Sequence, residues 1–177
     1  MTIKKILLGT AGLFAGYAMY RACEPKVPLN VKPVDGFDAE KYLGIWYEVG
    51  RLNNRFERNL IKTKAEYTLN EDGSIHVVNS GFNPLKGRHT QASGTALFVQ
   101  SRDKGALKVS FFGPFFGGYN IVALDENYQW SIVIGSNMNY FWVLSRDPVL
   151  SPDLRDRAIT VAMQHGIAPS SINWVEQ

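Results

Sequence analysis

Residues 38–50 read D-A-E-K-Y-L-G-I-W-Y-E-V-G, and the rest of the chain is organised around them. Asp38 is placed to cap one helical turn, because its carboxylate can accept hydrogen bonds from the backbone amides that follow. Gly44 lets the backbone change direction after that turn. Residues 45–49 are rich in strand-forming side chains. The stretch therefore predicts a short helical turn that leads into a strand carrying Trp46.

Downstream of this stretch, short runs of alternating character are interrupted by turn residues every 8 to 14 positions. This spacing is typical of an antiparallel sandwich or barrel. The predicted strands span residues 45–49, 63–69, 75–79, 88–100, 106–112, 119–125, 129–135 and 140–146. Ser151 and Pro152 then mark a helix start, since Ser suits the N-cap and Pro the first helical position. Gly166 ends this helix, and residues 172–175 form a last short strand.

The excess positive charge of the chain lies at its beginning. Of its 19 basic residues, three (Lys4, Lys5 and Arg21) fall in the first 23 positions without an acidic neighbour. The 16 basic residues that remain balance the 16 acidic ones. A nucleic-acid partner requires a basic stripe on the folded body, so we expect no nucleic-acid partner. The remaining length of about 150 residues suits one domain with a single core.

Residues 1–23 have the pattern of an export signal, because Lys4 and Lys5 precede 15 uncharged residues, 6–20. This run is shorter than the ~20 residues that span a hydrocarbon core comfortably, which favours a signal peptide over a permanent helix. Cys23 is the only cysteine, so no disulfide can stabilise the fold. Residues 24–33 carry three prolines and predict an extended linker. Residues 34–177 remain as the folded domain.

Two later stretches support the interpretation of the chain as a barrel that begins with residues 38–50. Residues 124–128 (L-D-E-N-Y) and 141–148 (F-W-V-L-S-R-D-P) fall where a closing barrel needs a turn and a returning strand. Together with residues 38–50 they resemble the three signatures of the lipocalin family, and the likeness to bacterial lipocalins of the outer-membrane lipoprotein type is close. The resemblance implies an all-β fold, an eight-stranded antiparallel up-and-down lipocalin barrel with one C-terminal α-helix and a short final strand. The signature positions are Gly44, Trp46, Asp125, Tyr128 and Arg146.

Cys23 resembles the lipid-attachment site of bacterial lipoproteins, where the thiol receives a diacylglyceryl group. Ala22 suits the position before the cysteine, whereas Tyr20 replaces the usual Leu and Arg21 departs from the pattern. The alternative is an uncleaved N-terminal anchor with an unmodified Cys23. Either way the body is tethered in the bacterial cell envelope. The resemblance implies the lipid anchor, on the periplasmic side of the outer membrane.

The resemblance also implies that the Arg146 guanidinium lies over the Trp46 indole near the closed end of the barrel and donates to backbone carbonyls. Such a cation–π contact stabilises a desolvated charge. Because alternate residues of a strand share a face, an inward Arg146 places Leu144, Trp142 and Tyr140 inside as well.

On the preceding strand the polar residues Gln129 and Ser131 suit the outside of the barrel. By the same alternation, Trp130, Ile132 and Ile134 are then expected to point inward.

A barrel of eight strands has room for one small ligand. We expect an apolar lining that consists of Ala65, Tyr67, Val77, Phe98, Val109, Phe111, Trp130 and Trp142. Each of these residues alone is more typical of an ordinary core side chain. As a set, with small residues facing large aromatic ones, they resemble the lining of lipocalins that hold an acyl chain. The resemblance therefore implies a lipid-binding protein that stores or transports lysophospholipids or fatty acids in membrane maintenance.

Residues 111–119, F-F-G-P-F-F-G-G-Y, are the least ordinary local stretch of the chain. One interpretation is a wide hairpin loop whose aromatic rings lie on the sheet. The other is functional, with the rings at the barrel rim or in contact with a membrane or a second subunit, so a homodimer is a possible assembly.

The sequence contains none of the motifs G-x-S-x-G, H-E-x-x-H, C-x-x-C or G-x-G-x-x-G, and no P-loop. His76, His89 and His165 lie on separate elements, without the spacing of a metal site. We therefore expect no enzyme, no metal and no cofactor. Two alternatives stay open: a haem or tetrapyrrole carrier or isomerase built on the same barrel, and a purely structural envelope protein with a filled interior.

Overall fold

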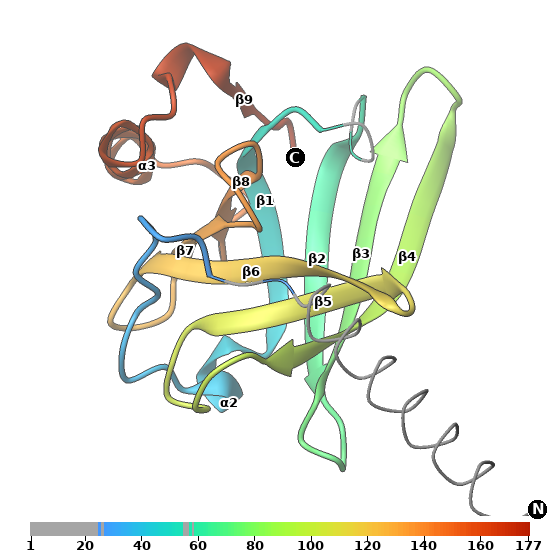
Figure 1. Ribbon diagram of the computed structural model, residues 1–177. Helices are drawn as coiled ribbons and strands as arrows, with labels where there is room; N and C mark the ends of the chain where they lie inside the picture. Colours follow the sequence, from blue (N-terminus) through green and yellow to red (C-terminus); the bar gives the residue numbers. More distant parts are fainter. Residues whose placement is uncertain (1–24, 26, 55–56, 58) are drawn as a thin grey trace, which may run out of the picture.

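A computed structural model describes residues 25, 27–54, 57 and 59–177 (Figure 1). The leader and Cys23 lie outside the described residues. Within the described ranges, no helix is long and apolar enough to cross a membrane.

The described chain forms a closed antiparallel barrel. Its strands follow the order β2-β3-β4-β5-β6-β7-β8-β1, and pairing of β1 with β2 closes the sheet. A ninth strand, β9, pairs with β1, and this arrangement confirms the predicted fold class. The elements in chain order are α2 (Ala39–Tyr42), β1 (Gly44–Leu52), β2 (Ile61–Leu69), β3 (Ile75–Asn83), β4 (Arg88–Phe98), β5 (Ala106–Phe112), β6 (Phe115–Leu124), β7 (Trp130–Ile134), β8 (Phe141–Ser145), α3 (Pro152–Gln164), η1 (Pro169–Ser171) and β9 (Ile172–Trp174).

The up-and-down order gives the barrel two distinct ends. The connections β1–β2, β3–β4, β5–β6 and β7–β8 lie at one end, which we call the mouth. Helix α2 lies at the opposite, closed end, at the bottom of Figure 1. Trp46 and Arg146 belong to this closed end, since they neighbour α2 and the end of β8.

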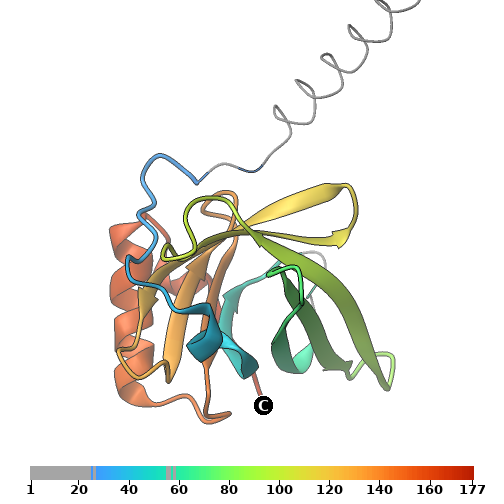
Figure 2. The ribbon, with the colours of Figure 1, turned by 90° about the horizontal axis from the view of Figure 1, so that it is seen from below.

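Helix α3 covers part of the outside of the barrel (Figure 2). Its start follows the predicted chemistry, because Ser151 Oγ accepts from the Leu154 amide and Pro152 takes the first helical position. Leu154, Ala158 and Ala162 are buried on its inner stripe. The protein therefore has two apolar clusters, one inside the barrel and one between the barrel and α3.

The aromatic stretch at residues 111–119 differs from the wide loop that one interpretation expected. Strand β5 runs to Phe112 and β6 begins at Phe115, and these two residues are direct cross-strand partners. Only Gly113 and Pro114 form the turn. The ladder continues to the tip because aromatic side chains are good strand formers that pack across a hairpin.

Candidate functional site

The closed end is held by one arginine. The Arg146 guanidinium lies 3.9 Å from the centre of the Trp46 ring. It donates to the carbonyl oxygens of Ile45 (2.6 Å), Leu43 (2.7 Å) and Lys41 (3.0 Å). Gly44 is required beside it, because its φ is +89° and a Cβ there would come within 3.4 Å of Arg146 Nη1. This is the geometry that the family resemblance implies for the pair.

The remaining signature residues fix the turn that faces this arginine. The Asp125 carboxylate accepts from the amides of Asn127 (3.0 Å) and Gln129 (3.2 Å). Tyr128 has a φ of +58°, its carbonyl accepts from Arg146 Nε, and its hydroxyl accepts from the Asp38 amide at 2.8 Å. These contacts tie the β6–β7 turn to α2. Their role is therefore to close the barrel.

Aromatic side chains fill the lower half of the interior, next to the closed end. The hydroxyl of Tyr42 lies 2.8 Å from those of Tyr119 and Ser131, and Tyr67 lies 2.9 Å from Tyr119. Trp46 is fully buried and donates to the Tyr42 carbonyl. Burial raises the pKa of Tyr42 to about 12, against the opposing hydrogen bonds of Ser131 and Tyr119. Burial likewise raises the pKa of Tyr67 and Tyr119 well above 10, so all three are neutral donors.

The residues expected to line a ligand cavity occupy different levels of the barrel. Ala65, Tyr67 and Val77 are buried in the filled lower half. Phe98 packs against Phe37 at the closed end, under the Arg102 guanidinium. Val109, Phe111 and Trp142 also keep some exposed surface. These three are the expected residues that remain candidates for ligand contact near the mouth.

Trp130 is not inside the barrel, and the inward orientation predicted for Trp130, Ile132 and Ile134 is wrong. All three belong to the cluster between the barrel and α3, and Arg157 of α3 lies over the Trp130 ring at 5.5 Å. The helix makes the outer face of β7 apolar. The inner face of that strand instead carries Ser131, which is buried because Tyr42 satisfies its hydroxyl.

The neighbouring strand behaves as predicted. Trp142 and Leu144 pack with the interior cluster, and Trp142 is the cross-strand partner of Val133, which shares that face. The rings of Tyr140 and Trp142 stack at 6.0 Å with an angle of 22° between their planes.

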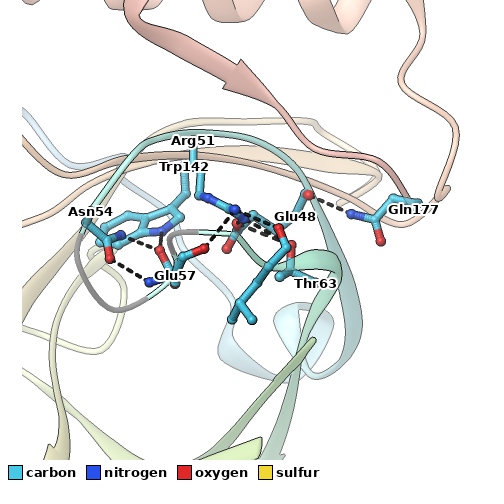
Figure 3. Close-up of polar contacts among 8 residues, drawn as sticks. Glu48, Arg51, Asn54, Glu57, Thr63, Trp142 and Gln177 are labelled. Atoms are coloured by element: carbon cyan, nitrogen blue, oxygen red, sulfur yellow. Dashed lines mark hydrogen bonds and ion pairs between the residues drawn. The ribbon is translucent and has the colours of Figure 1, made fainter. Parts of the chain in front are cut away.

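A buried polar cluster occupies the wall of the upper interior (Figure 3), where an apolar lining was expected. Arg51 is 1% exposed and donates to Glu48 Oε1 at 2.5 Å and to Thr63 Oγ1 at 3.4 Å. It also donates to the carbonyl oxygens of Glu57 (2.9 Å) and Leu60 (2.7 Å). Arg51 thereby holds described residues of the β1–β2 connection to the barrel wall.

Glu57 links this connection to the expected ligand residue Trp142. Its carboxylate accepts from Trp142 Nε1 at 3.1 Å and from the Asn54 side-chain amide (Figure 3). The bond orients the Trp142 ring, since an indole has one donor to satisfy. Asn79, on β3, has a buried Oδ1 without a hydrogen-bond partner among the described residues.

The buried position of Glu48 changes the pKa of its carboxyl group. Burial raises the pKa of Glu48 to about 8, and the nearby Glu57 carboxylate adds to the rise, while Arg51 and Thr63 oppose it. Sequence reasoning missed this residue although a signal was present, because alternation from an inward Trp46 also places Glu48 inward. Arg51 was harder to find. A register shift between Glu48 and Gly50 brings Arg51 opposite Trp142, and the sequence does not reveal that shift.

Two further features bear on function: a surface pocket and the distribution of possible metal ligands. A polar surface pocket of about 380 Å³ lies outside the barrel at the closed end, lined by Lys41, Glu126, Asn127, Tyr128, Gln129 and Arg146. Its arginine is already engaged with backbone carbonyls, so the pocket offers no apolar site. Among the residues that the structure describes, no three His, Cys, Asp or Glu side chains are grouped to hold a metal ion.

Comparison with known proteins agrees with this geometry. The family model described as lipocalin-like domain matches residues 37–177. Outer membrane lipoprotein Blc of Escherichia coli (strain K12) is 42% identical over 173 residues, covering 98% of each chain. The protein of that name from Vibrio cholerae is 43% identical over 152 residues, 85% of this chain and 89% of its own. Temperature-induced lipocalin-1 of Arabidopsis thaliana is 31% identical, with 84% of this chain covered and 83% of its own.

Solved structures with the same fold are more distant in sequence. The cockroach allergen Per a 4 superimposes with a TM-score of 0.67 at 20% identity, covering 88% of this chain and 96% of its own. Insecticyanin from the tobacco hornworm gives 0.66 at 21% identity, with 87% and 88% covered. None of these names is that of an enzyme, and those of the bacterial relatives agree with the expected outer-membrane location. From the matched family model and the identities to its relatives, the chain belongs to the lipocalin family.

Proposed function

We propose that the protein binds one single-chain lipid, a lysophospholipid or a fatty acid, in the upper half of its barrel. It stores or carries this lipid in membrane maintenance and catalyses no reaction. Its body is held at the periplasmic side of the outer membrane through lipid attached to Cys23, a residue outside the described part of the chain.

The observation that carries this proposal is the change in burial along the barrel interior. Trp46 and Tyr42 are almost completely buried at the closed end, whereas Val109, Phe111 and Trp142 keep exposed surface toward the mouth. An apolar chain that enters from the mouth would cover these side chains. Buried aromatic side chains occupy the lower half of the interior. We therefore expect a bound lipid to have a single acyl chain that enters only the upper half.

Chain length gives the test. Each buried CH₂ contributes about 0.8 kcal/mol, so affinity for fatty acids and lysophospholipids should rise with chain length and then level off once the upper interior is full. The measurement is displacement of a fluorescent fatty acid, with diacyl lipids as competitors. A flat dependence on chain length, or equal binding of diacyl and monoacyl lipids, would contradict the proposal.

A second candidate is a structural barrel that holds no ligand. The filled lower half and its tyrosine network favour it. Absence of binding for every lipid in the same titration would select this candidate. An intense visible absorption band of the purified protein would instead select a haem or tetrapyrrole carrier.

A further inference from the structure

The tip of the β5–β6 hairpin exposes two large apolar rings. Phe112 is 82% exposed and Phe115 is 74% exposed. They are direct cross-strand partners, so both side chains project from the same face of the hairpin. Exposed aromatic pairs of this kind mark contact sites more often than isolated apolar residues do.

The N-terminal segment contacts the same two strands, β5 and β6, at their ends away from the hairpin tip. The Val34 amide donates to the Ile121 carbonyl of β6, and the Gly105 amide, next to β5, donates to the Val34 carbonyl. Upstream of these contacts, Leu29 is fully exposed. In Figure 2 the blue segment before α2 and the yellow β5–β6 hairpin both lie along the upper side of the barrel.

The attachment point proposed above lies close to this side. Pro25 follows Cys23 by two positions, and each extended residue spans at most about 3.6 Å. A lipid on Cys23 would therefore hold the N-terminal segment within a short distance of the bilayer. The side of the barrel that carries the segment is then the side that faces the membrane.

We propose that Phe112 and Phe115, here called the hairpin surface, rest on the lipid surface of the membrane that holds the anchor. The inference depends on the proposed tether at Cys23. Aromatic rings are favoured at the interface between water and hydrocarbon, and the tether supplies a high effective concentration for a contact that is weak by itself. Because the hairpin is a mouth connection, this contact brings the rim of the barrel to the source of its lipid.

The test uses the full-length lipoprotein reconstituted in vesicles, with Cys23 acylated. Phe112→Cys and Phe115→Cys each supply one free thiol for an environment-sensitive fluorophore. Val149→Cys is the matched control, because Val149 is 72% exposed on the β8–α3 connection, at the closed end of the barrel. Vesicles are prepared with and without nitroxide groups on the lipid acyl chains.

We expect blue-shifted emission that nitroxide lipids quench for both hairpin labels, and little quenching for the label at position 149. Hairpin labels that are quenched no more than the control would overturn the inference and leave lipid binding untouched. A blue shift that depends on protein density but not on nitroxide would replace the membrane by a second copy of the chain. If the unlabelled protein did not float with vesicles, the proposed tether at Cys23 would be wrong, and the inference that depends on it would be overturned.

Discussion

Arg146 is the residue on which the closed end depends. Its guanidinium covers the Trp46 indole and donates to three carbonyl oxygens around α2, so removing it would uncover the indole and break these hydrogen bonds. Trp46 has no exposed surface and supports the floor of the interior. Both residues therefore stabilise the barrel rather than select a ligand.

We predict that Trp46→Ala lowers the free energy of unfolding by roughly 3 to 5 kcal/mol, as for other truncations of buried aromatic residues. Arg146→Ala should also lower stability and leave the order of ligand preference unchanged. Denaturant unfolding, with and without lipid, measures both effects. Full stability of Arg146→Ala combined with lost binding would mean that its structural role is misassigned.

Glu48 gives the protein a pH dependence of defined sign. Its pKa is raised to about 8 in the folded state because burial and the Glu57 carboxylate disfavour the charge, against Arg51 and Thr63. The folded state then holds a proton that the unfolded state releases near pH 4.5. The stability that this group contributes is present below that pH and is lost as the pH rises toward about 8.

The corresponding prediction concerns Glu48→Gln, which keeps an acceptor for Arg51 but cannot ionise. Between pH 5 and pH 9 the wild type should lose more stability than the variant, by an amount on the order of a few kcal/mol. Urea unfolding at each pH measures the difference. Parallel stability curves for the two proteins would show that Glu48 does not titrate in this range.

At the scale of elements, β7 and β8 each present a tryptophan, and the two point in opposite directions. Trp130 packs on the outside beneath Arg157 of α3. Trp142 lies inside and is oriented by Glu57. The two strands are direct neighbours, so the pair forms a matched comparison between a position outside the barrel and one inside it.

We predict that Trp130→Ala destabilises the protein by about 2 kcal/mol through lost packing of α3, with lipid affinity unchanged. Trp142→Ala should instead weaken lipid binding and abolish the fluorescence change on binding. Both are measured by lipid titration beside thermal unfolding. If lipid binding were weakened in Trp130→Ala and unchanged in Trp142→Ala, the assignment of the two strand faces would be reversed.

The same two strands show which side-chain orientations could be predicted from the sequence and which could not. Arg146 belongs to a signature, and alternation from it correctly placed Trp142 and Leu144 inside. For β7 the rule that polar residues face water failed, because α3 buries the outer face and Tyr42 satisfies Ser131 inside. The orientation of a strand buried on both sides cannot be read from polarity alone.

The polar cluster of the upper interior was harder to foresee than the fold. Helix capping follows from a local pattern, and the strand order and the closed end follow from the family resemblance. The position of Arg51 depends on a register shift within β1, and that of Glu57 on a bond to Trp142, 85 residues away. Such long-range contacts leave no local signature.

For the whole molecule, the proposed attachment to the membrane depends on one side chain, that of Cys23. We predict that Cys23→Ser abolishes incorporation of labelled palmitate and releases the protein from the envelope, with the barrel still folded, since the barrel contains no disulfide. Metabolic labelling and membrane fractionation measure this. Equal labelling in the variant, or none in the wild type, would support the uncleaved anchor instead.

The central claim is that the upper barrel holds one single-chain lipid, and mass spectrometry under native conditions tests it most directly. Protein would be isolated from its own envelope in mild detergent, as wild type and as Trp142→Ala, and the non-covalent mass would be separated from any acylation at Cys23. We predict one bound monoacyl lipid for each wild-type barrel and a reduced share in Trp142→Ala. Wild-type barrels that carry no lipid, or that carry diacyl lipid as often as monoacyl lipid, would contradict the claim.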